Sequence, residues 1–245
     1  GYFICGKEVI SPTFAPFKRD GGAYKAVFSD GKAEYFNTRA NCSMKVYTPL
    51  VISGEGREYT LKNEADRQKE YSFVFAERVS LIERRAYVSH PAFCDLFVSA
   101  KTDKAKNTVY LNRKPRESTG GFTLAATVLA GGADCEFECN RQNLYGRNGS
   151  DFNPALNFGG NAPSEGDVIT PCIGIKCDFT LAPGESKKLA VVIQCAEDEN
   201  VLESRVERVL GTDFLGYALS PAGSGEQSAL NKYMPDERTA IYAGK

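Results

Sequence analysis

The chain has 245 residues, and its 30 basic and 31 acidic side chains leave a formal net charge of −1. Such a balanced chain has no global field that would draw it to nucleic acid or to an anionic membrane surface. No apolar run approaches the roughly 20 residues that a transmembrane helix needs, and the N-terminus lacks a signal-peptide layout. We therefore expect a soluble, cytoplasmic globular protein with no nucleic-acid partner and no membrane contact.

Most of the chain has the pattern of short strands separated by turn residues. In the segment 43–48, Met44 and Val46 alternate with Lys45 and Tyr47, which is typical of a half-buried strand. Asp30-Gly31 is a hairpin signal. No helices alternate with the strands, so the sequence predicts an all-β fold, a large two-sheet antiparallel β-sandwich. The expected strands are 23–29, 33–37, 43–48, 57–62, 71–77, 108–112, 121–129, 175–181 and 188–194.

One C-terminal helix is expected at 199–210, where Leu202, Val206 and Val209 share a face and Gly211 provides a stop. The expected organisation is a sandwich domain over 1–196, a helix leaving the sandwich at 197–211 and a tail or linker over 212–245. The composition of the tail shifts to Ala, Gly, Ser and charged residues from Ser220 onward.

The eight cysteines lack the C-x-x-C spacing of zinc sites, so we expect no metal and no cofactor. Several occupy positions where an apolar strand residue would fit, and free cysteine behaves as a small buried hydrophobe. Reduced structural cysteines are the favoured interpretation, with one or more disulfides as the alternative. The cysteines are Cys5, Cys42, Cys94, Cys135, Cys139, Cys172, Cys177 and Cys195.

Residue types suited to catalysis are sparse. His90 is the single histidine, and Cys94 lies four residues after it, which by itself says little about a catalytic dyad. Glu136 and Glu138 should project from the same strand face, where such pairs are usually solvated. We therefore predict no catalytic residue in this chain.

The densest polar cluster surrounds a glycine turn and consists of Tyr145, Arg147, Asn148, Asp151 and Asn153. Its simplest interpretation is a structured loop. The alternative is a surface for sugar or a protein partner, because function concentrates on loops that a rigid sheet holds in place. The absence of tryptophan weakens the case for a stand-alone carbohydrate-binding module.

Four stretches in this order resemble one known family. They are Ser11-Pro12-Thr13; the segment 87–98, which reads YVSHPAFCDLFV; the segment 144–150, LYGRNGS, followed by Asn153-Pro154-Ala155-Leu156; and the segment 170–175, TPCIGI, which runs on to 181–186, LAPGES. Together they resemble the β-sandwich domain that precedes the catalytic barrel in glycoside hydrolase family 94. The resemblance covers roughly residues 1–210 and is strongest to cyclic β-1,2-glucan synthases, with cellobiose and chitobiose phosphorylases as relatives.

This resemblance implies a supersandwich fold followed by an (α/α)₆ barrel that carries the general acid. It implies that the sandwich supports the barrel, helps homodimer contacts and lends loops to the β-glucan site. It also suggests that a loop is anchored to the core by Ala92, Phe93, Leu96 and Phe97, and that His90 hydrogen-bonds the backbone rather than acting as a catalyst. The chain has no barrel sequence, so the family's catalytic residue has no counterpart here.

Three hypotheses follow from these observations. The first is a non-catalytic sandwich domain of a glycosyltransferase or glycoside phosphorylase. The second is a free-standing carbohydrate-binding module, which a shallow groove lined by Tyr and Asn side chains would favour. The third is a protein-interaction or dimerisation domain, which a large exposed apolar patch would favour.

Overall fold

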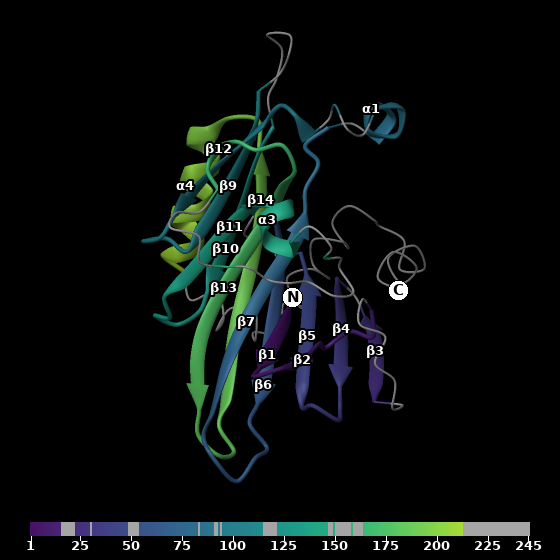
Figure 1. Cartoon of the computed structure of the whole chain (residues 1–245), viewed down its shortest axis with the longest axis vertical. Helices are drawn as coiled ribbons and strands as arrows, with labels where there is room; N and C mark the ends of the chain where they lie inside the picture. Colours follow the sequence, from purple (N-terminus) through teal and green to yellow (C-terminus); the bar gives the residue numbers. More distant parts are fainter. Residues whose placement is uncertain are drawn as a thin grey trace, which may run out of the picture.

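The protein forms two antiparallel β-sheets packed face to face, as the sequence predicts (Figure 1). The computed structural model describes residues 1–15, 23–29, 31–48, 54–82, 84–90, 93, 95–114, 122–146, 149, 158 and 164–212. The predicted tail therefore lies outside the described residues from position 213 onward. Within the described part, no helix is both long and apolar enough to cross a membrane.

The smaller sheet has five strands in the order β11-β13-β7-β1-β2. Its two longest strands, β13 and β7, pair over ten positions from Cys172↔Arg78 to Leu181↔Lys69. The bounds are β1 Tyr2–Cys5, β2 Glu8–Ile10, β7 Lys69–Arg78, β11 Cys135–Asn140 and β13 Pro171–Leu181.

The larger sheet has nine strands in the order β12-β8-β9-β10-β14-β6-β5-β4-β3, so it extends well beyond the smaller one. The hairpin between β3 and β4 pairs Ser29 with Lys32, and Gly31 has a φ of 68°, which suits the predicted turn; Asp30 lies outside the described residues. The bounds are β3 Tyr24–Ser29, β4 Lys32–Asn37, β5 Cys42–Tyr47, β6 Gly54–Lys62, β8 Val98–Asp103, β9 Thr108–Arg113, β10 Thr123–Leu129, β12 Gly166–Asp167 and β14 Ser186–Ala196.

The main core lies between the two sheets and is built from alternate residues of each strand. The Phe73 ring of β7 lies 5.4 Å from Phe3 and 4.8 Å from Tyr59 of the opposite sheet. Leu189 and Val191 of β14 are fully buried in the same cluster. Each such side chain contributes about 1.5–3 kcal/mol by leaving water, so this layer fixes how the sheets stack.

The predicted C-terminal helix is confirmed as α4, Glu199–Leu210, and it packs on the outer face of the larger sheet (Figure 1). Leu202 and Val206 contact Tyr110 and Ala125 of that sheet. Asp198 caps the helix by accepting hydrogen bonds from the backbone amides of its first turn. The helix is further held by Lys106, whose ammonium lies 3.1 Å from Glu203 and 2.6 Å from Glu207.

The expectation that all the cysteines are reduced is wrong for two of them, because Cys135 and Cys177 form a disulfide. They stand directly opposite each other on β11 and β13, with their Cα atoms 4.4 Å apart. Sequence spacing could not find this bond, since its partners are separated by 42 positions and meet only through strand pairing. Cys5, Cys42, Cys139, Cys172 and Cys195 are free.

Candidate functional site

Of the five predicted contact residues, the structure places Tyr145, the last residue of α3, Arg141–Tyr145. The other four, Arg147, Asn148, Asp151 and Asn153, lie outside the described residues. The Tyr145 side chain is half-buried, and the Arg141 guanidinium lies 5.7 Å from the centre of its ring. This cation–π contact holds the ring against its own helix.

Helix α3 is anchored at both ends by short-range sequence signals. Asn140 accepts a hydrogen bond from the Gln142 amide at 2.9 Å, and the Thr170 hydroxyl donates to the same oxygen at 2.9 Å. The Arg141 amide donates to the Thr170 carbonyl at 2.8 Å. Leu144 is fully buried, and Gly146, with a φ of 72°, ends the helix. The start of the predicted polar loop is therefore fixed to the sheet.

Gly149 closes the turn that follows α3. Its amide donates to the Gly146 carbonyl at 3.2 Å. A Cβ atom at this position would lie 1.6 Å from the Tyr145 backbone oxygen, so the turn has no room for a side chain. The backbone geometry alone therefore explains why the LYGRNG motif has glycine at these positions, whether or not the loop binds a ligand.

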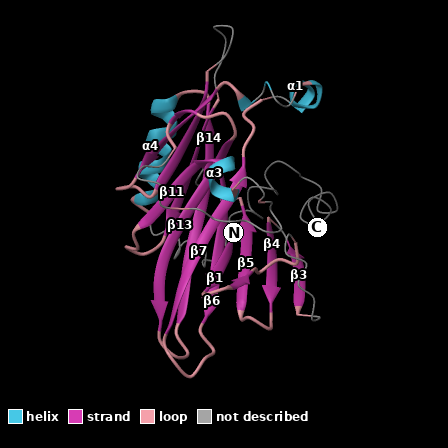
Figure 2. Ribbon diagram, viewed as in Figure 1, coloured by secondary structure: helices cyan, strands magenta, loops and turns pink. Residues whose placement is uncertain are grey.

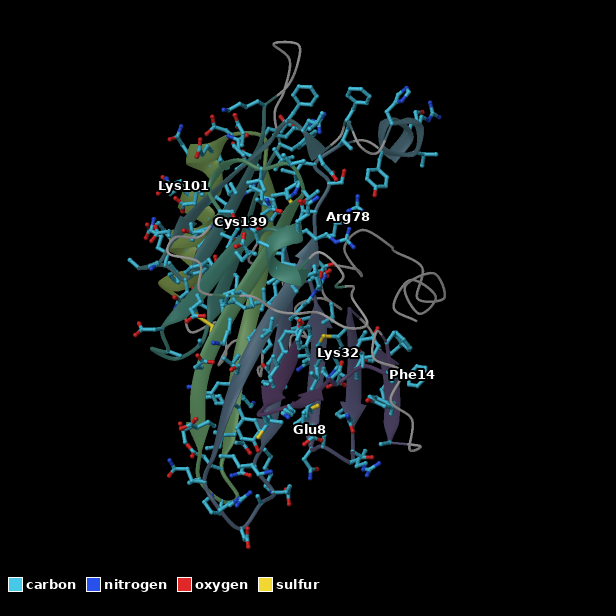
Figure 3. The ribbon with its side chains drawn as sticks, viewed as in Figure 1. Glu8, Phe14, Lys32, Arg78, Lys101 and Cys139 are labelled. Atoms are coloured by element: carbon cyan, nitrogen blue, oxygen red, sulfur yellow. A yellow bond between two sulfur atoms is a disulfide. The ribbon has the colours of Figure 1, made fainter. Side chains whose placement is uncertain are left out.

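A second motif segment leaves the sandwich at the end of β7 and forms α1, Arg84–Ser89 (Figure 2). Figure 3 labels Arg78 at the end of β7, on the side of the molecule where α1 and α3 lie. Its guanidinium lies 3.3 Å from the Asp95 carboxylate and 5.7 Å from the centre of the Tyr87 ring. Asp95 is only 7% exposed, so this ion pair ties the segment back to the sheet.

The expected anchoring of this segment is wrong for Phe93 and Leu96, whereas Phe97 is half-buried and Ala92 lies outside the described residues. Phe93 is 64% exposed and Leu96 is 49% exposed, so neither reaches the core. His90 is also exposed, and its ring meets Phe93 edge-on at 6.2 Å. Its expected hydrogen bond to the backbone stays a prediction. The anchoring role falls to Asp95 and to Val98, whose carbonyl accepts from the Val168 amide.

The exposed apolar side chains of this region define what we call the loop surface: Val88, Phe93, Leu96 and Ile169. Ile169 lies between two anchored residues. The Val168 amide donates a hydrogen bond to the Val98 carbonyl, and the Thr170 hydroxyl donates one to the Asn140 side chain just before α3. Ile169 therefore links the segment around α1 to the segment around α3. Exposed apolar patches are typical of contact surfaces.

The acidic pair on β11 has a different role from the solvated one expected. Glu136 is exposed and lies 3.4 Å from Lys176. Glu138 is buried, and its carboxylate accepts a hydrogen bond from the Asn140 amide at 2.7 Å. The prediction that both carboxylates are solvated is therefore wrong for Glu138, which helps to shape the start of α3.

Two free thiols lie beneath the start of α3. Cys139 is buried, and desolvation raises the pKa of its thiol to about 12. Desolvation likewise raises the pKa of Cys172, whose sulfur lies 3.6 Å from the Glu138 carbonyl oxygen. Both thiols stay protonated near neutral pH and are poor nucleophiles. Among the described residues, no group of three His, Cys, Asp or Glu side chains is placed to hold a metal ion.

A family model described as "Glycosyl hydrolase 94, supersandwich domain" matches residues 5–211. A search of curated proteins found no match. Similar solved structures include Heparinase III, with 13% identity, a TM-score of 0.43, and coverage of 81% of this chain and 24% of that one. Another is the family GH92 alpha-mannosidase BT3965 from Bacteroides thetaiotaomicron, with 12% identity, a TM-score of 0.38, and coverage of 78% and 22%. The chain thus spans about a quarter of the length of these two proteins.

Proposed function

The chain belongs to the glycosyl hydrolase 94 supersandwich family, and from that premise we propose that it is a non-catalytic domain that supports the catalytic barrel of a carbohydrate-active enzyme. The observation that carries the proposal is the family match over residues 5–211, which includes both sheets and α4. The parent activity would be that of a glycosyltransferase or glycoside phosphorylase, as for the cyclic glucan synthases and cellobiose phosphorylases that the motifs resemble.

The loop surface is the proposed contact with the barrel. Its four apolar side chains are exposed, and the Arg78–Asp95 ion pair and the Val168–Val98 hydrogen bond hold the backbone next to Leu96 and Ile169. A preordered apolar surface loses little conformational entropy on docking, which favours a stable interface between domains. Ile169 of this surface precedes Thr170, which donates to Asn140 at the start of α3, so the predicted β-glucan contact at Tyr145, Arg147, Asn148, Asp151 and Asn153 would begin near this end of the interface.

Two measurements test the support role. The purified chain should release no sugar phosphate from cellobiose or from β-1,2-linked gluco-oligosaccharides in the presence of phosphate. It should bind an (α/α)₆ barrel of the same family, and Phe93→Asp should weaken that binding at least about tenfold by placing a charge in an apolar contact. Phe28→Asp is the matched control, because Phe28 is a similarly exposed aromatic residue on β3, away from the loop surface.

Turnover by the chain alone would overturn the non-catalytic role. If Phe93→Asp and the control bind the barrel equally well, the loop surface is not part of the interface with the barrel. The alternative functions, a free-standing carbohydrate-binding module and a homodimerisation domain, predict instead oligosaccharide binding without a barrel and a concentration-dependent mass in light scattering.

A further inference from the structure

The larger sheet continues past the smaller one, and the face that forms the core continues with it. Leu61 of β6 is buried, and the same row of paired residues runs through Cys42 and Asn37 to Tyr24 on the edge strand β3. The smaller sheet ends at β2, so it does not extend over β3 and β4 (Figure 2). A step therefore forms between the β2 edge of the smaller sheet and the face of the larger sheet that continues past it.

A groove of about 420 Å³ occupies this step. Such a volume falls in the range of about 300–1,000 Å³ that is usual for small-molecule sites. One wall is β2, and the other is the end of the β3–β4 hairpin. The lining residues that matter for binding include Glu8, Tyr24, Asn37, Arg39, Asn63 and Lys69.

Internal hydrogen bonds hold the polar residues of the groove floor in place. The Asn37 amide donates to the Ser11 carbonyl at 3.0 Å, and its oxygen accepts from the Ala40 amide at 3.2 Å. The Asn63 amide donates to the Leu181 carbonyl at 3.0 Å, and its oxygen accepts from the Tyr71 hydroxyl at 3.3 Å. The floor is thus fixed before any ligand arrives, which lowers the entropic cost of binding.

The walls offer both acceptors and donors. Lys62 and Glu64 pair with each other at 2.5 Å, which leaves Glu8 and Lys69 on strands of the smaller sheet and Arg39 between β4 and β5 of the larger one. Within the part of the chain that the structure describes, those three side chains make no ion pair. Figure 3 labels Glu8 at β2. A ligand with hydroxyl groups, which both donate and accept, can use side chains of both signs.

An aromatic track leads out of the groove along the same sheet face. The Tyr24 ring meets Phe14 edge-on at 5.7 Å, and Phe28 meets Tyr35 edge-on at 6.1 Å. Tyr24 and Phe28 share one face of β3, and the register places Tyr35 on that face through its pairing with Ala26. Aromatic faces beside polar groups match a pyranose ring, which has apolar C–H faces and a polar rim.

From these features we propose that the groove and the aromatic track bind a neutral gluco-oligosaccharide. The unpaired wall side chains are two cations and one anion, so their net charge is too small to select an anionic chain, whose charges Glu8 would also repel. The choice of a glucan rests on the proposed function, whereas the groove itself does not. The site lies on β2, β3 and β4 and shares no residue with the loop surface, so it would hold a glucan chain apart from the docked barrel.

Calorimetry of the purified chain with β-1,2- and β-1,4-linked gluco-oligosaccharides tests this proposal. We expect affinity to rise with chain length, because longer chains reach Phe28, and to change less than about twofold between low and high salt. Arg39→Ala and Tyr24→Ala should each weaken binding about tenfold. Lys25→Ala is the matched control, since Lys25 is an exposed cation next to Tyr24 but points to the opposite face of β3.

Because Tyr24→Ala removes a packing partner of Phe14, the exposed Arg39 provides the variant that leaves the fold intact. The absence of binding to both glucan types would overturn the proposal. So would binding of sulfated oligosaccharides alone with a steep salt dependence, or an equal loss in Arg39→Ala and Lys25→Ala. Failure here is distinguishable from failure of the support role, because Arg39→Ala should leave binding to the barrel unchanged.

Discussion

A Cβ atom placed on Gly149 would lie 1.6 Å from the Tyr145 backbone oxygen, well inside contact distance. We therefore expect Gly149→Ala to open the turn after α3 and to lower the free energy of unfolding by about 1–3 kcal/mol in urea titrations. Gly211→Ala is the control, because its Cβ would lie 3.4 Å from the Glu207 oxygen and its φ of −80° suits any residue. Equal stability of the two variants would contradict the proposed tight turn.

Buried thiols, among them Cys42, Cys139 and Cys172, make the stability of the protein depend on alkaline pH. Desolvation raises the pKa of Cys42 and of Cys139 from 9.0 to about 12. Below about pH 9 both thiols are protonated in the folded and unfolded states, so they add no pH dependence. Between these values only the unfolded chain loses the protons, and stability should fall by up to about 1.4 kcal/mol per pH unit for each thiol.

Urea unfolding at about pH 8 and about pH 10 measures this effect. Cys42→Ala should have a shallower pH slope than the wild type, because one buried acid is gone. Leu124→Ala also removes a buried side chain but no titrating group, and it should keep the wild-type slope. If the slopes of the two variants agree, Cys42 does not titrate with a raised pKa.

The loop surface shows where residue-level prediction failed. The hydrophobic character of Phe93 and Leu96 suggested core positions, yet both are exposed, while the charged Asp95 between them is buried against Arg78. Hydrophobicity alone cannot separate a core anchor from a contact surface, because both use the same side chains. Asp95 is buried because β7 places the Arg78 guanidinium beside it, and this tertiary contact cannot be predicted from the local sequence.

At the scale of elements, the disulfide joins β11 to β13 across 42 positions of sequence. Closing a loop of that length stabilises a fold by about 4 kcal/mol, chiefly by restricting the unfolded chain. We expect the double variant Cys135→Ala/Cys177→Ala to lose about that much in urea unfolding, and a reductant to lower the wild type to the same level. The reductant should not affect the double variant. A non-reduced peptide map without the linked pair would contradict the assignment.

The long elements were predictable because local pattern and tertiary burial agree in them. Helix α4 was expected at 199–210 and has those bounds, since its apolar stripe, Asp198 cap and Gly211 stop are all local signals. Strands β1 and β2 were missed, because four and three residues are too few to show a period. Helix α1 was missed for the same reason, and its six residues carry no apolar stripe.

For the whole molecule, alternation predicts two packed sheets but not their unequal width. One row that runs from β6 to β3 keeps its apolar character while burial falls, from fully buried Tyr59 through half-buried Met44 and Tyr35 to exposed Ala26. Each strand therefore looks alike in sequence, whether or not a second sheet covers it. The groove and its aromatic track follow from that difference in width, which is why no local motif indicated them.

The same gradient of burial predicts a gradient of local stability across the larger sheet. Amide protons of β14, which has Leu189 and Val191 in the core and α4 on its outer face, should exchange only by global unfolding. Those of β3, an edge strand with Phe28 72% exposed, should exchange far faster, with β4 and β5 between them. Hydrogen exchange followed by mass spectrometry measures all four strands in one experiment. Core-level protection of β3 would mean that a further part of the chain or a second copy covers this face, and the proposed glucan track would then be closed.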